Sequence, residues 1–427
     1  MYNTPVEQKE RAIVVGLVRS GQTRHRIEEF LDELELLADT AGAEVLERMI
    51  QSRDRMDPAF MLGKGKVEEL ANIAKYLDAD LIIFDDDLSP AQVKNIENMC
   101  KIKIMDRSGL ILDIFAKHAR TREARTQVEL AQLNYFLPRL TRQWTHLSRQ
   151  VGGIGVRGPG ETQLEVDRRL VRKRISVLET ELVQIQKQRD NRRKKRSEMF
   201  KAALVGYTNA GKSTLMNALT GAGTLVRDQL FATLDSTIRS MEMDQNKKTL
   251  LIDTVGFIRK LPHHLVASFK STLEEVIDSD LLLHVIDISA ADFEDQIRVV
   301  EAVLKDMGVE KKPMLKVFNK IDRIDDPNLI QRIKQEHEPC VFISAERGIY
   351  IHELEQKLVE YTDEHTRHLE LVLGSHQTRL LSMLHELGKV SDIEYTEDNK
   401  TIVKLIATRQ NAERIEKLVT NQENQVV

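Results

Sequence analysis

The feature that most constrains this chain is the eight-residue stretch Gly206-Tyr207-Thr208-Asn209-Ala210-Gly211-Lys212-Ser213. It has the G-x-x-x-x-G-K-[ST] spacing of a phosphate-binding loop, with an apolar run before it at 200–205 and a helical pattern after it at 213–219. A glycine-rich turn that precedes a helix by chance is the alternative. The strand–loop–helix setting favours a nucleotide-binding loop, and it predicts an α/β fold with phosphate at a helix N-terminus.

The residue types in this loop suit phosphate and magnesium. Gly206 and Gly211 let the backbone curve so that its N–H groups point toward phosphate oxygens. Lys212 can reach the β- and γ-phosphates, and the Ser213 hydroxyl is a ligand for Mg²⁺. The residues of the loop expected to contact the nucleotide are Gly206, Tyr207, Thr208, Asn209, Ala210, Gly211, Lys212, Ser213 and Thr214.

A loop in the position of switch I follows the first helix of this domain. Thr233 can supply a second hydroxyl to Mg²⁺ there and respond to the γ-phosphate, with Thr237 as the competing candidate. The nucleotide-binding residues expected in this loop are Phe231, Ala232, Thr233, Leu234 and Asp235.

The strand pattern at 249–252 ends in Asp253-Thr254-Val255-Gly256, where switch II is expected. We expect Asp253 to hold Mg²⁺ through water and the Gly256 N–H to contact the γ-phosphate, with Thr254 and Val255 beside them. The metal candidates are therefore Ser213, Thr233 and Asp253.

Guanine recognition is predicted from two further strand ends. The run at 314–318 leads into Asn319-Lys320-Ile321-Asp322, and the run at 341–343 leads into Ser344-Ala345-Glu346. The Asp322 carboxylate can accept two N–H groups from guanine, which adenine does not present in the same way. Asn319 is expected to tie this base-binding loop to the phosphate loop. Because all these motifs occur in order at strand ends, the sequence predicts a GTP-binding domain with GTP and GDP as substrate and product.

Phe257 follows Gly256 at a position where many switch GTPases have a glutamine that orients water. A phenylalanine ring cannot orient water by hydrogen bonding, so we expect slow intrinsic hydrolysis that a partner accelerates by ordering the switches. The alternative is that Phe257 packs beneath switch II and another polar group serves. The residues assigned to catalysis are Lys212, Thr233, Gly256 and Phe257.

Three regions are predicted around this GTPase domain, which we place at 198–364. Alternating strand and helix patterns predict an N-terminal α/β domain with a parallel sheet over 1–115. Apolar stripes with coiled-coil spacing predict a helical hairpin over 116–197, and 365–427 is interpreted as a small α+β domain. The Gly63-Lys64-Gly65-Lys66 turn is interpreted as a tight turn at a basic helix start, with a second nucleotide site as the alternative.

The hairpin is strongly basic although the chain as a whole is not. Residues 117–196 hold 20 Lys and Arg against 8 Asp and Glu, whereas the net charge of the chain is −4. The expected tip carries Trp144, the only tryptophan, and five glycines between Gly152 and Gly160. Arginine pairs with phosphate and tryptophan can stack on an unpaired base, so we predict contact with RNA. The alternative is a floppy surface loop, with Trp144 capping the hairpin.

The rest of the composition bears on the cellular compartment. The chain has two cysteines, Cys100 and Cys340, and no apolar run long enough to cross a membrane. We therefore expect a cytoplasmic monomer without a membrane span.

These residues together resemble the HflX family of ribosome-associated GTPases over essentially the whole chain. The resemblance is most specific at 152–165, at 231–235, and in the guanine motifs combined with Phe257; the Gly63–Lys66 turn also resembles a family signature. It implies binding to the large ribosomal subunit and the 70S ribosome, with the hairpin 117–196 on ribosomal RNA and its tip toward the peptidyl-transferase centre. It further implies GTP-dependent splitting of stalled ribosomes, notably under heat stress, partial association with ribosomes, and a secondary ATPase activity.

The same resemblance implies roles for single residues, namely Lys212 on phosphate, Ser213 and Thr233 on Mg²⁺, Gly256 on the γ-phosphate, and Asn319 and Asp322 on guanine. Three other functions stay open on the residues alone. They are an RNA-dependent ATPase or helicase-like enzyme, a ribosome assembly GTPase, and a signalling GTPase whose hairpin recruits proteins.

Overall fold

The computed structural model of the protein describes residues 9–140, 163–194, 199–221, 230–243, 247–260, 270–374, 378–396 and 400–423. These residues form two compact units. The first contains the described parts of Met1–Leu182 and Asp228–Leu234, and the second contains those of Val183–Arg227, Asp235–Lys260 and Phe269–Val427. No helix in the described ranges is both long and apolar enough to span a membrane.

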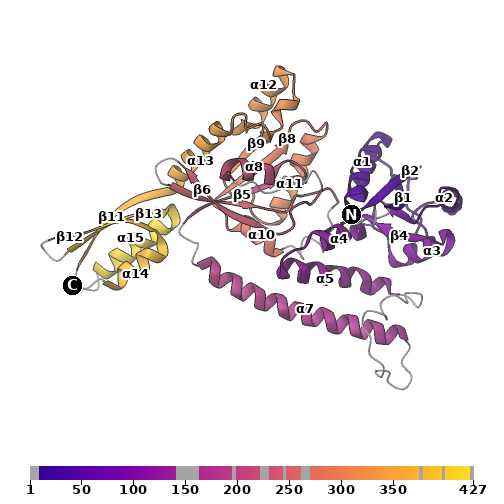
Figure 1. Cartoon of the computed structure of the whole chain (residues 1–427), viewed down its shortest axis with the longest axis horizontal. Coiled ribbons are helices and arrows are strands. Elements are labelled where there is room, and N and C mark those ends of the chain that lie inside the picture. Colours follow the sequence, from indigo (N-terminus) through magenta and orange to yellow (C-terminus); the bar gives the residue numbers. More distant parts are fainter. Residues whose placement is uncertain are drawn as a thin grey trace, which may run out of the picture. The chain divides into compact units, whose positions relative to one another are not determined.

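The first unit begins with a four-stranded parallel sheet in the order β2-β1-β3-β4. Its strands are β1 (Glu10–Val18), β2 (Ala43–Ser52), β3 (Leu81–Phe84) and β4 (Lys103–Asp106), and its helices are α1 (Arg24–Ala41), α2 (Lys64–Tyr76), α3 (Pro90–Cys100) and α4 (Arg107–His118) (Figure 1). Strands and helices alternate along the chain, as the sequence predicted. Helix starts follow local capping: the Thr23 side chain caps α1, and Ser89 with Gln92 forms a capping box on α3.

Two antiparallel helical segments follow, α5 (Arg122–Phe136) and α7 (Gln163–Lys194), with a short 3₁₀ turn, η1 (Leu137–Arg139), after α5. The predicted apolar stripe of α5 is buried, and it consists of Ala124, Val128, Ala131 and Tyr135. On α7, Val171 and Leu178 are buried as well, and Arg174 pairs with Glu129 across the two helices. The expected glycine-rich tip with Trp144 lies outside the described residues.

A buried carboxylate fixes the start of this helical pair to the N-terminal sheet. Asp106, at the end of β4, is fully buried and accepts hydrogen bonds from the Tyr135 hydroxyl (2.6 Å) and from Arg139 (3.0 Å). It also caps α4 by accepting from the Gly109 N–H at 2.9 Å. A buried charge needs such partners, so these bonds hold α5 in one position on the sheet.

The second unit is built on a six-stranded sheet in the order β10-β9-β8-β5-β7-β6, parallel except for β6. Its strands are β5 (Phe200–Gly206), β6 (Thr237–Met243), β7 (Lys247–Asp253), β8 (Leu281–Asp287), β9 (Met314–Asn319) and β10 (Cys340–Phe342). Its helices are α8 (Lys212–Thr220), α10 (Lys270–Ile277), α11 (Phe293–Asp306), α12 (Pro327–Glu336) and α13 (Ile351–His365). The carboxyl ends of β5, β7 and β9 carry the predicted motifs, and parallel neighbours bring such ends to one edge.

The last element group is a small antiparallel sheet in the order β11-β13-β12, formed by β11 (Thr366–Gly374), β12 (Lys389–Tyr395) and β13 (Lys400–Thr408). Helices α14 (Thr378–Leu387) and α15 (Arg409–Glu423) pack on it through a core that includes Leu380, Leu384, Val403, Leu405 and Ile415. The fold as a whole is the multidomain α/β architecture predicted from the sequence.

Candidate nucleotide site

The predicted phosphate loop joins β5 to α8, and two of its glycines are required by close contacts. Gly206 has φ 155°, and a Cβ atom there would lie 2.2 Å from the Val285 carbonyl oxygen. Gly211 has φ 93°, and a Cβ atom there would lie 2.3 Å from the Asn319 amide nitrogen. Only glycine fits both positions, and the loop delivers Lys212 to the first position of α8.

Lys212 lies inside this loop with its side chain almost fully buried. Its Nζ donates hydrogen bonds to the carbonyl oxygens of Tyr207 (2.8 Å) and Gly206 (3.2 Å). Burial lowers the pKa of this ammonium group to about 8, against the opposing charge of Asp253. A phosphate beside this buried ammonium would supply an opposite charge that favours the protonated form, so the site suits an anion.

Two of the three expected metal ligands meet beside the loop. The Ser213 hydroxyl donates to an Asp253 carboxylate oxygen at 2.7 Å, and only 3% of Asp253 is exposed. A hydroxyl and a carboxylate in contact form a set of hard oxygen donors that fits Mg²⁺. Thr233, the third expected ligand, lies in the other compact unit, and its part in a metal site stays a prediction.

The segment expected to be switch I is anchored by an aromatic contact that the sequence did not reveal. Phe231 is buried, and its ring packs edge-on against Phe115 of α4, with 4.7 Å between ring centroids. Leu234 is buried too, whereas Ala232 is exposed and Thr233 half-buried. The first compact unit therefore holds this segment through its apolar side chains, and it leaves the Thr233 side chain partly accessible.

The segment expected to be switch II is bound to the phosphate loop by its backbone. Phe257 donates its N–H to the Gly206 carbonyl (3.1 Å), and its own carbonyl accepts from the Thr208 N–H (2.7 Å). A Cβ atom on Gly256 would lie 2.6 Å from Thr208 Cα, so the two segments are in direct contact. The Phe257 ring is 2% exposed, as the packing alternative expected, and its assignment to catalysis stays a prediction.

A side-chain contact strengthens this connection. The Tyr207 hydroxyl accepts a hydrogen bond from the Arg259 N–H at 2.9 Å, and the Arg259 guanidinium forms an ion pair with Asp292. Both Tyr207 and Arg259 are buried. The sequence placed Tyr207 in the phosphate loop, but nothing in the pattern indicated that its ring would hold switch II.

Asn319 links the base-binding loop to the phosphate loop. Its amide nitrogen donates to the Ala210 carbonyl (2.9 Å), and its amide oxygen accepts from the Ala345 N–H (2.9 Å). Lys320 adds a hydrogen bond to the Asn209 carbonyl at 3.0 Å. Three loops that are far apart in the sequence are thus joined through one buried amide, which positions base and phosphate contacts relative to each other.

Asp322 lies in the short 3₁₀ turn η3 (Ile321–Arg323) after β9. Its carboxylate is 7% exposed, and a hydrogen bond from the Ser344 hydroxyl, more than the charges of Arg347 and Arg323, holds its pKa below the usual value for an aspartate. The carboxylate is therefore ionised at neutral pH and able to accept hydrogen bonds. Glu346 and Arg347 follow Ser344 and Ala345 in the adjoining loop, where both side chains are exposed.

Three family models match the chain in succession. The model described as GTP-binding GTPase N-terminal matches residues 28–116, the GTP-binding GTPase Middle Region matches 118–196, and the 50S ribosome-binding GTPase matches 201–320.

Curated relatives match most of the chain. A GTPase HflX of Caldanaerobacter subterraneus is 46% identical over 91% of this chain and 89% of its own. The Escherichia coli GTPase HflX is 44% identical over 92% of both chains. Among solved structures, a GTP-binding protein from Sulfolobus solfataricus in complex with GDP has a TM-score of 0.43 and 26% identity, over 82% of this chain and 98% of its own.

Proposed function

This chain belongs to the HflX family of GTPases and hydrolyses GTP, and from that premise we propose that it binds the large ribosomal subunit and uses GTP to split stalled ribosomes. The observation that supports the nucleotide part most directly is the buried Asn319 amide, which joins the base-binding loop to the phosphate loop. The match of 201–320 to a family described as a 50S ribosome-binding GTPase supports the partner.

In the proposed nucleotide complex, Lys212 binds the β- and γ-phosphates and Asp322 binds guanine. Ser213, Thr233 and, through water, Asp253 would hold Mg²⁺, which would neutralise charge on the phosphates. The Gly256 N–H contacts the γ-phosphate. The backbone of Phe257 is hydrogen-bonded to the phosphate loop. A contact between the γ-phosphate and Gly256 would therefore affect the position of the whole start of switch II.

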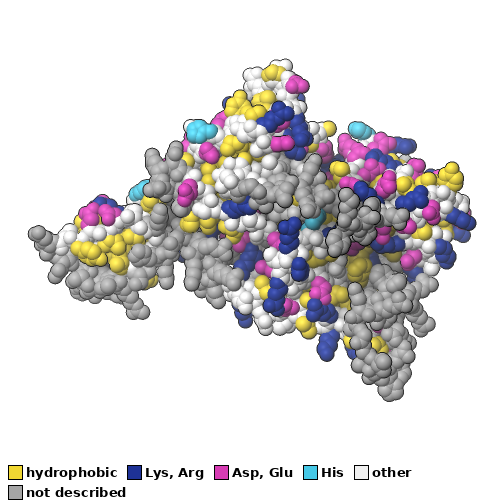
Figure 2. Space-filling view, viewed as in Figure 1, with side chains coloured by type: hydrophobic (Ala, Val, Ile, Leu, Met, Phe, Trp, Pro, Cys, Tyr) yellow, Lys and Arg dark blue, Asp and Glu magenta, His cyan; other side chains and the backbone are white. Residues whose placement is uncertain are grey.

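The basic helical pair is the proposed ribosome-binding element. Among the described residues, Arg172 and Lys173 on α7 are exposed and have no acidic partner, whereas Arg174 and Arg122 are paired with Glu129 and Glu181. Lys and Arg side chains (dark blue) lie along this part of the visible surface in Figure 2. Exposed basic side chains without acidic partners are available to phosphate groups of ribosomal RNA.

We further propose that ribosomes stimulate hydrolysis by ordering switches I and II, and that the protein acts as a cytoplasmic monomer when ribosomes stall, notably under heat stress. A secondary ATPase activity is part of the same proposal. A GTPase that relies on a partner for rapid turnover hydrolyses GTP rapidly only where the partner is present.

A charge-reversal experiment tests the ribosome contact. We expect the double variant Arg172→Glu/Lys173→Glu to lose co-sedimentation with large subunits and ribosome-stimulated hydrolysis, while GDP binding is unchanged. The matched control is Arg332→Glu/Lys334→Glu, which reverses one Arg and one Lys on exposed positions of α12. If both double variants bind large subunits equally well, the proposed contact between α7 and the ribosome is refuted.

A further inference from the structure

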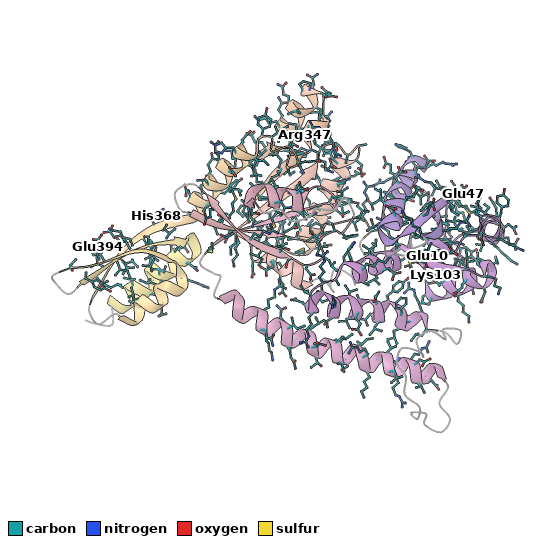
Figure 3. The ribbon with its side chains drawn as sticks, in the orientation of Figure 1. Glu10, Glu47, Lys103, Arg347, His368 and Glu394 are labelled. Atoms are coloured by element: carbon teal, nitrogen blue, oxygen red, sulfur yellow. The ribbon has the colours of Figure 1, made fainter. Side chains whose placement is uncertain are left out.

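The carboxylate proposed to receive guanine is engaged by an arginine of the neighbouring loop. Arg347, which lies between β10 and α13 and is labelled in Figure 3, places its Nε 3.1 Å from an Asp322 carboxylate oxygen. The Asp322 side chain is 7% exposed and that of Arg347 is 66% exposed. One partner is therefore fixed in the base-binding loop, and the other is a long side chain that is mostly in solvent.

The two possible partners of Asp322 present the same chemistry. Guanine offers its N1–H and its 2-amino group, two donors on either side of one carbon atom. The guanidinium group of Arg347 offers N–H donors in the same arrangement, which matches a carboxylate. We propose that Arg347 mimics guanine: it occupies Asp322 when no nucleotide is bound, is displaced by the base, and returns to the carboxylate as GDP leaves.

This role presupposes that Asp322 binds guanine, as proposed for this site, and it adds a residue that sets nucleotide affinity and exchange. A side chain that competes for Asp322 weakens GDP binding, because the base must replace an ion pair and not merely water. It also shortens the lifetime of GDP, because the arginine begins to bind the carboxylate while the base is still leaving and so stabilises the transition state for release. Such a competitor favours exchange of GDP for GTP without a separate exchange factor.

The backbone around Arg347 stays in place when its side chain moves. The Arg347 N–H donates to the Ser344 hydroxyl oxygen at 3.2 Å, and Ser344 and Ile349 exchange two backbone hydrogen bonds of 3.1 Å. Arg347 also has no second acidic partner among the described residues. Release of Asp322 therefore needs only a change of side-chain rotamers, which takes nanoseconds or less at an exposed position.

Asp322 stays a good acceptor when Arg347 is gone. The Ser344 hydroxyl donates to it and makes the largest contribution to keeping this carboxylate ionised. Removal of the arginine charge thus removes the competitor and leaves the guanine acceptor ionised. A substitution at Arg347 is for this reason a test of competition and not of the acceptor itself.

The expected effect is modest, because exposed ion pairs contribute little and are screened by salt. We expect Arg347→Gln to bind GDP about two- to fivefold more tightly and to release it more slowly by a similar factor. The difference from the wild type should shrink as the salt concentration rises. The matched control is Arg298→Gln, which removes a similarly exposed arginine paired with Asp295 on α11 and should leave GDP affinity unchanged.

The experiment measures binding and release of a fluorescent GDP by stopped flow in the full-length protein, with Asp322→Asn and the double variant included. Xanthosine diphosphate serves as the ligand for the Asp322→Asn proteins, because its C2 carbonyl accepts from the new amide. In that background Arg347→Gln should have no effect, since the carboxylate for which the arginine competes is missing.

The outcomes test separately whether Asp322 binds guanine and whether Arg347 competes with guanine for Asp322. If Asp322→Asn leaves GDP affinity unchanged, the guanine assignment of Asp322 is wrong. If Asp322→Asn loses GDP but Arg347→Gln binds GDP as the wild type does, or more weakly, the assignment stands and the competition by Arg347 is refuted. Tighter binding with slower release, confined to proteins that have Asp322, supports the proposal.

Discussion

The buried ammonium of Lys212 should make GDP affinity depend on pH in a defined window. Burial lowers the pKa of Lys212 to about 8. A phosphate next to the ammonium would raise this pKa, because an opposite charge favours the protonated form. Above pH 8 the free protein has lost the proton and must take it up on binding. GDP affinity should therefore fall as the pH rises through about 8.

The size of the effect follows from the pKa. With a pKa of about 8, roughly nine-tenths of Lys212 is protonated at pH 7 and roughly one-tenth at pH 9. GDP affinity should be nearly constant below pH 7.5 and should fall about tenfold between pH 7 and 9, which corresponds to about 1.4 kcal/mol. The decline in GDP affinity ends only above the pKa that Lys212 has in the GDP complex, which is higher than its pKa in the free protein.

Equilibrium binding of GDP, followed between pH 6 and 9 at constant ionic strength, measures this dependence. Lys212→Met is the control for titration of the nucleotide and of other side chains. This variant should bind GDP more weakly than the wild type, with an affinity that is nearly constant over the same pH range. A wild-type affinity that does not change between pH 7 and 9, or an equal decline in Lys212→Met, would refute the role assigned to the buried ammonium.

Three further substitutions test the connections between loops. Phe231→Ala should lower the free energy of unfolding by about 3 kcal/mol in urea titrations. A double-mutant cycle with Phe115→Leu should show a coupling energy of about 1 kcal/mol. Additive effects of the two substitutions would mean that the ring contact is not made. Tyr207→Phe removes the acceptor of the buried Arg259 N–H, at a cost of about 1–3 kcal/mol, and should speed hydrogen exchange of that amide; unchanged exchange would contradict the bond. Asn319→Ala removes both amide hydrogen bonds and should reduce GDP affinity at least about tenfold in the same binding assay. Retention of full affinity would show that the base-binding loop and the phosphate loop are joined in another way.

The parts of the site that sequence could predict are those set by strand ends. Lys212, Asp253 and Asn319 all follow short apolar runs, and parallel neighbouring strands bring such ends to one edge of a sheet. Spacing alone therefore indicated which side chains gather there. The same reasoning gave the alternating N-terminal sheet, because each strand and helix carries its own apolar pattern.

Apart from the link that Asn319 makes, the contacts between loops could not be predicted, because no periodic pattern specifies them. The ring of Phe231 meets α4, an element that was not itself expected, and an exposed Arg347 looks like any solvated loop residue in the sequence. The hydrogen bond from the Arg259 N–H to the Tyr207 hydroxyl depends on how two turns face each other in the folded protein, which the sequence does not specify. The hairpin tip with Trp144 lies outside the described residues, so its predicted contact with RNA stays a prediction.

The central proposal is tested most directly by sedimentation of 70S ribosomes after incubation with the protein and GTP, GDP, or a GTP analogue that is not hydrolysed. We expect 70S particles to separate into free subunits with GTP and with the analogue, and to stay intact with GDP. Intact 70S particles in all three mixtures, at protein concentrations that saturate ribosome-stimulated hydrolysis, would contradict ribosome splitting and leave a ribosome-activated GTPase with another task.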